Sequence, residues 1–447
     1  MPEPTARPLV SYYGDDLTGS TDVMEALSLG GVPTVLFVNR PDDKLLARFA
    51  DCRAMGLAGT SRSETPAWME ENLAPAFAWL RSLGAALCHY KVCSTFDSSP
   101  SVGSIGRATE IGRRVFGQEA VPLVVGAPQL RRYTTFGHLF AAYRGEVFRI
   151  DRHPVMSRHP VTPMDEADLL RHLSKQTALR GALVDLVEMR SAERAAIVDR
   201  RLAEGAAMLL LDVCDGETQR AAGAELWRLR ERAPFVVGSS GVEYALLAAW
   251  REAGLIGEPA RFDMAGPVER LAVVSGSVSP TTERQIAHAT ANGFDGIAVD
   301  PLDLIGEGRE QAIAAAAAAG LGVLSNGRSV ILYTALGPEA DRGAEIDRHP
   351  AARHRIGEGL GAILRHLVLE RGLRRAVVAG GDTSSHALRQ LGVDALTVRM
   401  PLPQTPGSPL CVAHARQAGI DGLEIALKGG QIGTDRYFQA IREGRPD

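Results

Sequence analysis

The stretch PLVSYYGDDLTGSTDVMEALSLGGVPTVLFV, residues 8–38, decides the fold class. Residues 8–13 form an apolar run rich in β-forming residues, and residues 14–19 interrupt it with two glycines and two adjacent carboxylates. Apolar residues at helical spacing follow over residues 20–29, a glycine pair ends them, and residues 32–38 predict a second strand. A strand, a helix and a strand in this order predict a β-α-β unit, and therefore a parallel sheet covered by helices.

The same alternation continues through the chain, whose 447 residues exceed what one hydrophobic core usually serves. A boundary is predicted at residues 257–267 (GEPARFDMAGP), where two prolines and two glycines lie in a stretch without periodicity. We therefore expect an α/β fold with two domains, residues 1–258 and 268–447, each a mostly parallel sheet covered by helices. The active site is expected in the cleft between the domains. Further strands are predicted over residues 120–125, 181–187, 208–213, 271–274, 329–333 and 375–379.

Composition argues against several classes of protein. The net charge of -4 and the pI of about 6.3 indicate no basic patch for nucleic acid or for a membrane surface. No apolar run approaches the ~20 residues that span a bilayer. The five cysteines are odd in number and scattered, without the spacing of a zinc site, so we expect reduced thiols in a cytoplasmic protein. A homo-oligomer is left open, since the sequence carries no interface signal.

Three polar segments of the first half are candidates for binding and catalysis. Asp15 and Asp16 follow the first predicted strand, at the edge of an open α/β sheet where ligands bind. A carboxylate there could accept a proton from a substrate hydroxyl, although either residue could instead cap the next helix. Arg62 suits bidentate recognition of a carboxylate, with a solvated surface arginine as the alternative. Residues 90–100 (YKVCSTFDSSP) offer a lysine for an acid and hydroxyls for a polyol, with a serine-rich turn as the alternative.

Three glycine-rich turns mark the second half. They lie at residues 274–280 (VSGSVSP), 379–385 (AGGDTSS) and 427–433 (LKGGQIG). Such turns let backbone N–H groups and a helix N-terminus face a phosphate, though any tight strand-helix turn favours glycine. Three of them in one domain indicate a nucleotide site. The chain has neither a GxxxxGK[ST] loop nor a GxGxxG fingerprint after its first strand, which argues against a P-loop ATPase and an ordinary NAD-binding domain.

Six motifs together resemble the four-carbon acid sugar kinase family. They are DDLTGSTD, TSRS, HPVTPMDEADL, SGSVSPTTERQI, GGDTSSHAL and LKGGQIG, and they run in order from Asp15 to Gly433. The resemblance implies an N-terminal domain that binds a sugar acid and a C-terminal domain that binds ATP. It also implies phosphorylation of a terminal hydroxyl of tetronates or 3-oxo-tetronates, with ATP and Mg²⁺ as cofactors.

The family's site residues fall, by position, on the segments described above. Asp382 stands where the family often has Glu, which keeps a carboxylate available for Mg²⁺. The resemblance implies substrate contacts at Asp15, Asp16, Arg62, Lys91, Cys93, Ser94 and Thr95. It implies ATP contacts at Ser277, Gly380, Gly381, Asp382, Thr383 and Gly430.

One loop departs from the family pattern. The family usually reads K-I-D-S-T-L-R-G where residues 91–98 read KVCSTFDS, so Cys93 replaces an Asp and Asp97 replaces an Arg. Losing a cation and gaining an anion beside the substrate should change which acid is recognised. The prediction is a branched five-carbon 3-oxo acid such as 3-oxo-isoapionate, whose extra hydroxymethyl group would meet Ser98 and Ser99.

These observations lead to the hypothesis of an ATP-dependent sugar-acid kinase. Arg62 and Lys91 would hold the carboxylate and the oxo group, and hydroxyls of the loop would bind those of the substrate. Asp16, or Asp15 if the strand phase is shifted, would take the proton of the terminal hydroxyl. One alternative is a dinucleotide-dependent sugar-acid oxidoreductase, which lacks the glycine fingerprint. The other is a non-catalytic sugar-acid sensor, which would not need the paired carboxylates.

Overall fold

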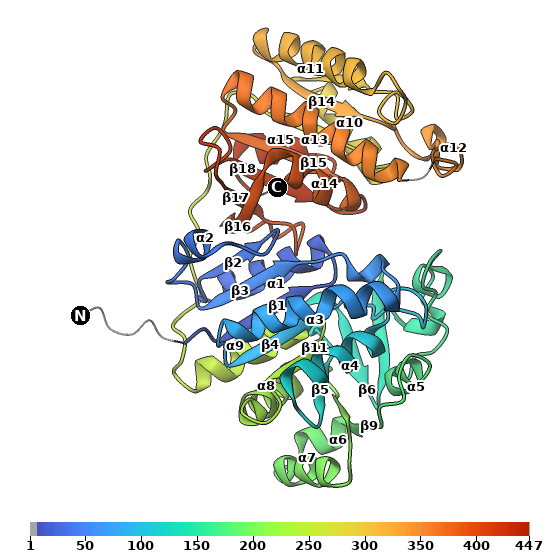
Figure 1. The fold of residues 1–447 in the computed structure, drawn as a ribbon, viewed down its shortest axis with the longest axis vertical. Coiled ribbons are helices and arrows are strands. Elements are labelled where there is room, and N and C mark those ends of the chain that lie inside the picture. The colour runs from blue at the N-terminus through green and yellow to red at the C-terminus, as the bar shows by residue number, and fades with distance from the viewer. Residues whose placement is uncertain (1–6, 350, 447) are drawn as a thin grey trace, which may run out of the picture. The chain divides into compact units, whose positions relative to one another are not determined.

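The computed structural model describes residues 7–349 and 351–446, apart from the side chain of Asp382 (Figure 1). The chain divides into two compact units. Unit 1 consists of Met1–Val35 with Asp42–Ala260, and unit 2 consists of Leu36–Pro41 with Arg261–Asp447. The α/β fold with two domains is confirmed. None of the helices in the described ranges combines the length and the apolar content that crossing a bilayer requires.

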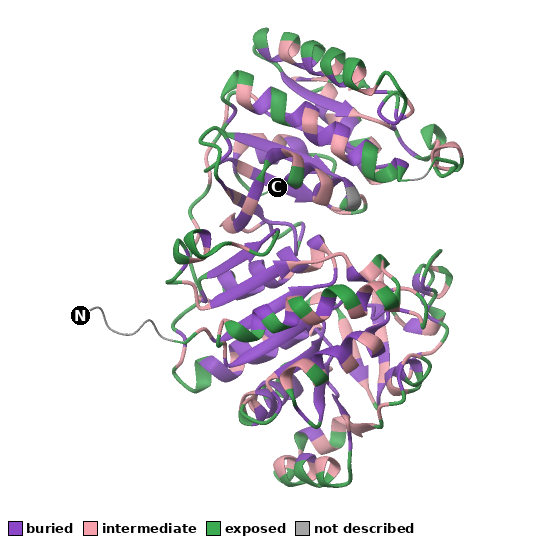
Figure 2. Cartoon of the chain, in the orientation of Figure 1, coloured by how far each residue is buried: buried purple, intermediate pink, exposed green. Residues whose placement is uncertain are grey.

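Unit 1 is built on a parallel sheet with the strand order β3-β1-β4-β11-β5-β10-β9. Most residues of these strands are buried (Figure 2), as expected for parallel strands that are covered on both faces. The division between the units falls within β2 (Thr34–Phe37). The strands of the sheet are β1 (Val10–Gly14), β3 (Ala54–Ala58), β4 (Leu87–Lys91), β5 (Val121–Val124), β9 (Gly181–Val184), β10 (Met208–Leu211) and β11 (Phe235–Gly238).

Helices cover both faces of this sheet, with α1 against α9, α9 against α8, and α3 against α4 (Figure 1). Polar side chains start many of them, because a carboxylate or hydroxyl can accept the free N–H groups of a first turn. Thr65 caps α3 and Ser104 caps α4 in this way. The helices are α1 (Leu17–Leu29), α2 (Asp43–Ala47), α3 (Pro66–Ser82), α4 (Ile105–Phe116), α5 (Leu169–Ser174), α6 (Leu186–Arg190), α7 (Arg194–Ala203), α8 (Gly216–Leu229) and α9 (Gly241–Glu252).

Two features of unit 1 differ from the sequence-based expectation. The strand predicted over residues 181–187 ends at Val184, because Asp185 and Glu188 form a capping box that starts α6. A small antiparallel sheet was not predicted. It consists of β6 (Arg132–Thr135), β7 (His138–Tyr143) and β8 (Glu146–Arg149), joined by two-residue turns that each contain a glycine with positive φ.

Unit 2 contains a mixed sheet with the strand order β13-β14-β12-β15-β18-β17-β16. The strands from β13 to β18 in this order pair in parallel, and β17 and β16 pair antiparallel at the other side. The strands are β12 (Ala272–Ser275), β13 (Phe294–Ala298), β14 (Ser329–Tyr333), β15 (Arg375–Ala379), β16 (Val393–Met400), β17 (Leu410–Ala415) and β18 (Glu424–Lys428).

The core of unit 2 joins this sheet to helices packed against it. Ile286 of α10 and Phe438 of α15 share one fully buried cluster with Val273, Ile331 and Val377 of the parallel strands. The helices α11, α13 and α14 pack against one another and against β12, β14 and β15. The helices are α10 (Pro280–Thr290), α11 (Arg309–Ser325), α12 (Gly343–Ile346), α13 (Ala352–Arg371), α14 (Gly381–Leu391) and α15 (Tyr437–Glu443).

Candidate active site

Three of the predicted segments of unit 1 leave the sheet at the same edge. The last residue of β1, Gly14, pairs with Ala58 of β3 and with Lys91 of β4, so the loops that follow begin side by side. The Asp15 N–H donates to the Lys91 carbonyl (2.9 Å), and the Arg62 N–H donates to the Asp15 carbonyl (3.1 Å). The predicted substrate-contact segments are therefore neighbours in the structure.

Asp16 is the N-cap of α1. Its carboxylate accepts a hydrogen bond from the Gly19 N–H and another from Arg62 Nη1 (2.9 Å). The helix-cap interpretation therefore describes Asp16, and its carboxylate already has a cationic partner.

Asp15 has a different environment. It is only 4% exposed, and its Oδ1 has no hydrogen-bond partner among the described residues. Burial, together with the charge of Asp16, raises the pKa of Asp15 to about 7. A Cβ at Gly19 would lie 3.7 Å from Asp15 Oδ1 and 3.0 Å from Lys91 Nζ, so the glycine leaves open the space beside these two groups. A carboxylate of this kind suits a proton acceptor that works near neutral pH.

Lys91 supplies a buried positive charge beside Asp15. It is 2% exposed, and its ammonium lies 3.7 Å from the Asp22 carboxylate of α1. Burial alone would lower the pKa of Lys91, but the carboxylates of Asp22 and Asp15 outweigh it and raise that pKa. Sequence reasoning missed Asp22, which looked like an ordinary helix residue.

Asp97, one of the two residues that depart from the family pattern, is hydrogen-bonded to the side chains around it. Its carboxylate accepts two hydrogen bonds from Arg62 Nη2 (3.1 and 2.9 Å), one from Thr95 (2.6 Å) and one from Thr162 (3.2 Å). The Cys93 sulfur lies 3.0 Å from the Thr95 hydroxyl. Arg62 is therefore held by two carboxylates of the protein itself, those of Asp16 and Asp97.

The serines of the same loop have different surroundings. Ser94 is half-buried between Cys93 and Thr95. Ser98 is buried, and its hydroxyl lies 2.9 Å from His172 Nε2 and accepts from the Gln176 amide (2.9 Å). Ser99 bonds within its own turn. The two serines expected to meet a hydroxymethyl group are thus engaged with the protein in this structure.

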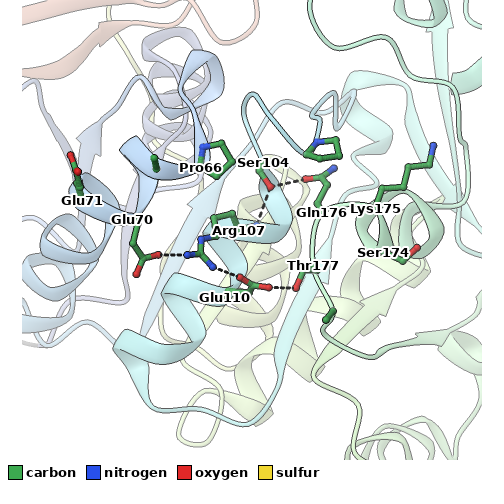
Figure 3. Close-up of a pocket in the computed structure, with 13 residues that line it drawn as sticks. Pro66, Glu70, Glu71, Ser104, Arg107, Glu110, Ser174, Lys175, Gln176 and Thr177 are labelled. Carbon is green, nitrogen blue, oxygen red and sulfur yellow. Dashed lines mark hydrogen bonds and ion pairs between the residues drawn. The ribbon is translucent and has the colours of Figure 1, made fainter.

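A cavity of about 830 Å³ lies elsewhere on unit 1, between α3, α4 and the segment after α5 (Figure 3). Its central charged groups pair with one another: Arg107 contacts Glu70 (3.0 Å) and Glu110 (2.7 Å), and Thr177 donates to Glu110. None of the predicted site residues lines it. The convergent polar groups at the strand ends therefore mark the candidate site better than cavity size does.

The three predicted glycine turns of unit 2 also meet. The Gly276 N–H donates to the Ala379 carbonyl (3.0 Å), and the Gly380 N–H donates to the Lys428 carbonyl (2.8 Å). Thr282 of α10 donates to the Gly430 carbonyl (3.0 Å). The three glycine turns therefore lie side by side and form one candidate nucleotide site.

Close packing explains why these turns contain glycine. A Cβ at Gly276 would lie 2.3 Å from the Thr383 hydroxyl, and one at Gly430 would lie 2.8 Å from the Ser277 hydroxyl. Gly380 has a φ of +121°, which side chains disfavour, and no side chain caps α14, which begins at Gly381. Uncapped N–H groups at a helix start can bind a phosphate. The side chain of Asp382, predicted as a Mg²⁺ ligand, lies outside the described residues.

Lys428 adds a buried cation that was not among the predicted ATP contacts. It is fully buried and donates to the Thr282 hydroxyl (3.1 Å) and to the carbonyls of Gly429 (2.8 Å) and Gly430 (3.3 Å). In the described ranges it forms no ion pair with a carboxylate, and burial lowers its pKa to about 7. The signal available in the sequence was a lysine directly before a glycine pair.

We expect Lys428→Met to abolish a proton uptake that accompanies nucleotide binding. At pH 8 a lysine with a pKa of about 7 is mostly neutral, and a phosphate bound nearby favours its charged form. Calorimetry with Mg-ADP in two buffers of different ionisation enthalpy measures the uptake. Arg284→Met, which removes an exposed cation of α10, is the matched control. Equal uptake by wild type and Lys428→Met would contradict this role.

Comparison with known proteins agrees with the geometry. The family of sugar-binding N-terminal domains matches residues 10–246, and the family of nucleotide-binding C-terminal domains matches residues 272–438. A 3-oxo-isoapionate kinase of Paraburkholderia graminis is 47% identical over 98% of this chain and 94% of its own length. The chain belongs to the four-carbon acid sugar kinase family.

A further curated relative and a solved structure are similar to this chain over nearly its whole length. A 3-oxo-tetronate kinase of Cupriavidus necator is 30% identical over 98% of this chain and 97% of its own length. A solved Salmonella typhimurium protein, described as a tRNA synthase, has a TM-score of 0.76 at 25% identity and covers 97% of this chain and 98% of its own. The fold is therefore shared over nearly the whole length of both chains.

Proposed function

We propose that this chain is an ATP-dependent kinase that phosphorylates a terminal hydroxyl of 3-oxo-isoapionate. The observation that carries the proposal is the 47% identity, over 98% of the chain, to the 3-oxo-isoapionate kinase of P. graminis. The two groups of strand-end loops support it. One holds a buried carboxylate with an oxygen, Asp15 Oδ1, that has no hydrogen-bond partner among the described residues, and the other holds glycine turns at helix starts. Because the proposed reaction consumes ATP, we expect the enzyme to act in the cytoplasm.

Unit 1 would bind the acid and activate its hydroxyl. Asp15 accepts the proton of the terminal hydroxyl as the oxygen attacks, because no described residue bonds to its Oδ1 and its pKa of about 7 allows both proton states. Lys91 places a positive charge next to Asp15 and the developing alkoxide. Arg62, held by Asp16 and Asp97, keeps the strand-end loops together.

Unit 2 would bind the nucleotide. ATP supplies the γ-phosphoryl group, and the uncapped backbone N–H groups at the start of α14, beside the turns at Gly276 and Gly430, would hold its phosphates. A cavity of about 90 Å³ lined by Gly276, Thr383, Thr334 and Ile356 adjoins these turns and offers room for part of the base. Catalysis then depends on positioning and charge neutralisation.

Mg²⁺ would be bound mainly through the phosphates. Among the described side chains, no group of three or more His, Cys, Asp or Glu residues is placed to hold a metal ion. Mg²⁺ in kinase sites is commonly held by one or two carboxylates together with substrate phosphates, so this donor set is compatible with it. Asp382 stays the proposed protein ligand.

A coupled ADP-release assay tests the proposal. Purified protein with Mg-ATP is given 3-oxo-isoapionate, 3-oxo-tetronate, and the reduced acids of four and five carbons. Turnover with 3-oxo-isoapionate is the expected result. No ADP release with any acid, and no nucleotide binding by calorimetry, would refute the kinase. Reduction of NAD with the reduced acids would favour the oxidoreductase instead.

We expect kcat/KM for the acid, measured at saturating Mg-ATP, to rise as the pH increases through about 7 and then to level off. The sign follows from Asp15, which must be ionised to accept a proton and whose pKa burial raises to about 7. Saturating nucleotide keeps titration at the nucleotide site out of the profile. A profile without slope between pH 6 and 8 would argue against Asp15 as the base.

A further inference from the structure

We infer that Arg132 binds the carboxylate of the sugar acid. The sequence had predicted this role for Arg62. The inference rests on the proposed function and names the residue that recognises the acid group. Arg132 begins β6, in the antiparallel sheet that the sequence did not reveal. It was not among the predicted substrate contacts.

The fold brings Arg132 to the same edge of the sheet as the other site loops. β5 lies beside β11, and β11 lies beside β4, all parallel, so the segments after them leave in one direction. Ala127, shortly after β5, forms a bridge with Arg132 through two backbone hydrogen bonds (2.9 and 3.1 Å). The arginine is thereby tied to the carboxyl end of β5, where ligands bind in open α/β sheets.

The guanidinium of Arg132 is fixed on one side only. Its Nη1 donates to the carbonyls of Leu130 (3.0 Å), Arg131 (3.3 Å) and Ala142 (3.4 Å). Its Nε is buried and has no hydrogen-bond partner among the described residues, and no bond from Nη2 is present there either. Nε and Nη2 form the edge of an arginine that binds a carboxylate through two parallel hydrogen bonds.

Arg132 and Arg62 differ in their carboxylate partners. Arg62 contacts the carboxylates of Asp16 and Asp97, both at 2.9 Å. Arg132 is half-buried, and no carboxylate lies within 4.0 Å of it in the described ranges. A partly buried cation without a counter-ion is costly, and an incoming carboxylate would neutralise it. Burial also lowers the pKa of Arg132, which agrees with an uncompensated charge.

Backbone hydrogen bonds link the segment that holds Arg132 to the loop after β4. The Val92 N–H donates to the Gly238 carbonyl at the end of β11 (2.8 Å). The Ser239 N–H donates to the Val124 carbonyl at the end of β5 (3.1 Å). A short acid whose carboxylate binds Arg132 would extend along this edge of the sheet, from the end of β5 toward Asp15 after β1.

The test compares the acid with its uncharged primary amide in wild type, Arg132→Met, Arg132→Lys and Arg62→Met. We expect Arg132→Met to raise KM for 3-oxo-isoapionate by about 10- to 100-fold, the weight of a lost charge-assisted pair, with little effect on the amide. Arg132→Lys should recover part of the loss. Arg131→Met, at the exposed neighbouring arginine, should match wild type. Thermal melting and Mg-ADP binding show whether each variant is folded.

The outcomes separate this inference from the proposed function. Turnover of the acid by wild type supports the function by itself. If Arg132→Met is folded and keeps the wild-type preference for acid over amide, Arg132 does not bind the carboxylate. If that preference disappears in Arg62→Met alone, the carboxylate binds at Arg62 and the inference is overturned. If wild type turns over no acid, the proposed function fails, and binding of the acid to wild type and Arg132→Met by calorimetry still decides the role of Arg132.

Discussion

Replacing Asp15 by Asn is expected to lower kcat by about 10²- to 10⁴-fold, the usual contribution of a positioned general base. The amide keeps the shape of the carboxyl group but cannot take the proton of the substrate hydroxyl. Binding of Mg-ADP should stay at the wild-type level, since Asp15 belongs to unit 1 and the nucleotide turns belong to unit 2. Steady-state kinetics and calorimetry measure the two effects separately. A kcat within a few-fold of wild type would exclude Asp15 as the base.

The melting temperature separates this effect from misfolding. Burial raises the pKa of Asp15 from 3.8 to about 7, so ionisation of Asp15 opposes folding as the pH rises between these values. Asn removes that cost, and Asp15→Asn should melt at or above the wild-type temperature at pH 8. Asp16→Asn is the matched control, because it keeps a capping side chain but removes a charged partner of Arg62. It should melt lower than wild type.

Replacing Gly380 by Ala is expected to weaken Mg-ADP binding by about 10-fold or more. The φ of +121° at Gly380 costs a residue with a side chain about 1–3 kcal/mol, and the new Cβ would lie 2.9 Å from the Thr383 hydroxyl. The turn must shift to relieve both, and its N–H groups then move away from the phosphates. Binding of the sugar acid to unit 1 should be unchanged, as calorimetry with each ligand will show.

Gly392 provides the matched control for Gly380. It ends the same helix, α14, with a φ of +70°, and a Cβ there would meet nothing within 4 Å. Gly392→Ala should therefore lower stability by about 1 kcal/mol without affecting nucleotide binding. If both variants bind Mg-ADP as wild type does, the turn at Gly380 does not hold phosphate.

The fold was predictable where local patterns determine it. The parallel strands carry apolar runs bounded by glycine and polar turns, and the strands predicted over 329–333 and 375–379 coincide with β14 and β15. The small sheet β6-β7-β8 was missed because β6 and β8 have only four residues each, and β7 (HLFAAY) lacks the alternation of apolar and polar residues that predicts a strand. The end of β9 was misplaced because apolar residues resume directly after Asp185, whereas the side chain of Asp185 caps a helix that starts there.

The grouping of the site loops was predictable, but the partners of each side chain were not. Loops after parallel strands share one edge of a sheet, so the sequence alone predicts that Asp15, Arg62 and Lys91 lie close together. The choice between the two carboxylates depends on which one points into the helix cap, and a shift of one residue reverses it. The pairing of Arg62 with Asp97 joins positions 35 residues apart, which no local pattern reveals. Such pairs arise only from the three-dimensional arrangement.

The same limit applies to the buried cations. Arg132 looks like an ordinary basic residue in the sequence, and Lys428 is marked there only by the glycine pair that follows it; the absence of a carboxylate partner in the described structure distinguishes both. The glycine turns of unit 2 were easier to recognise, because close approach of backbone and side chain leaves room for glycine alone.

A competition experiment tests the central claim most directly. Equal concentrations of 3-oxo-isoapionate and 3-oxo-tetronate are mixed with the protein and limiting Mg-ATP, and the two phosphorylated products, which differ in mass, are quantified together. The product ratio equals the ratio of the two kcat/KM values. The account predicts that the branched product exceeds the linear one by at least about tenfold, because two acids that bind one site are distinguished by contacts that only one of them can make. A predominance of the linear product would contradict it.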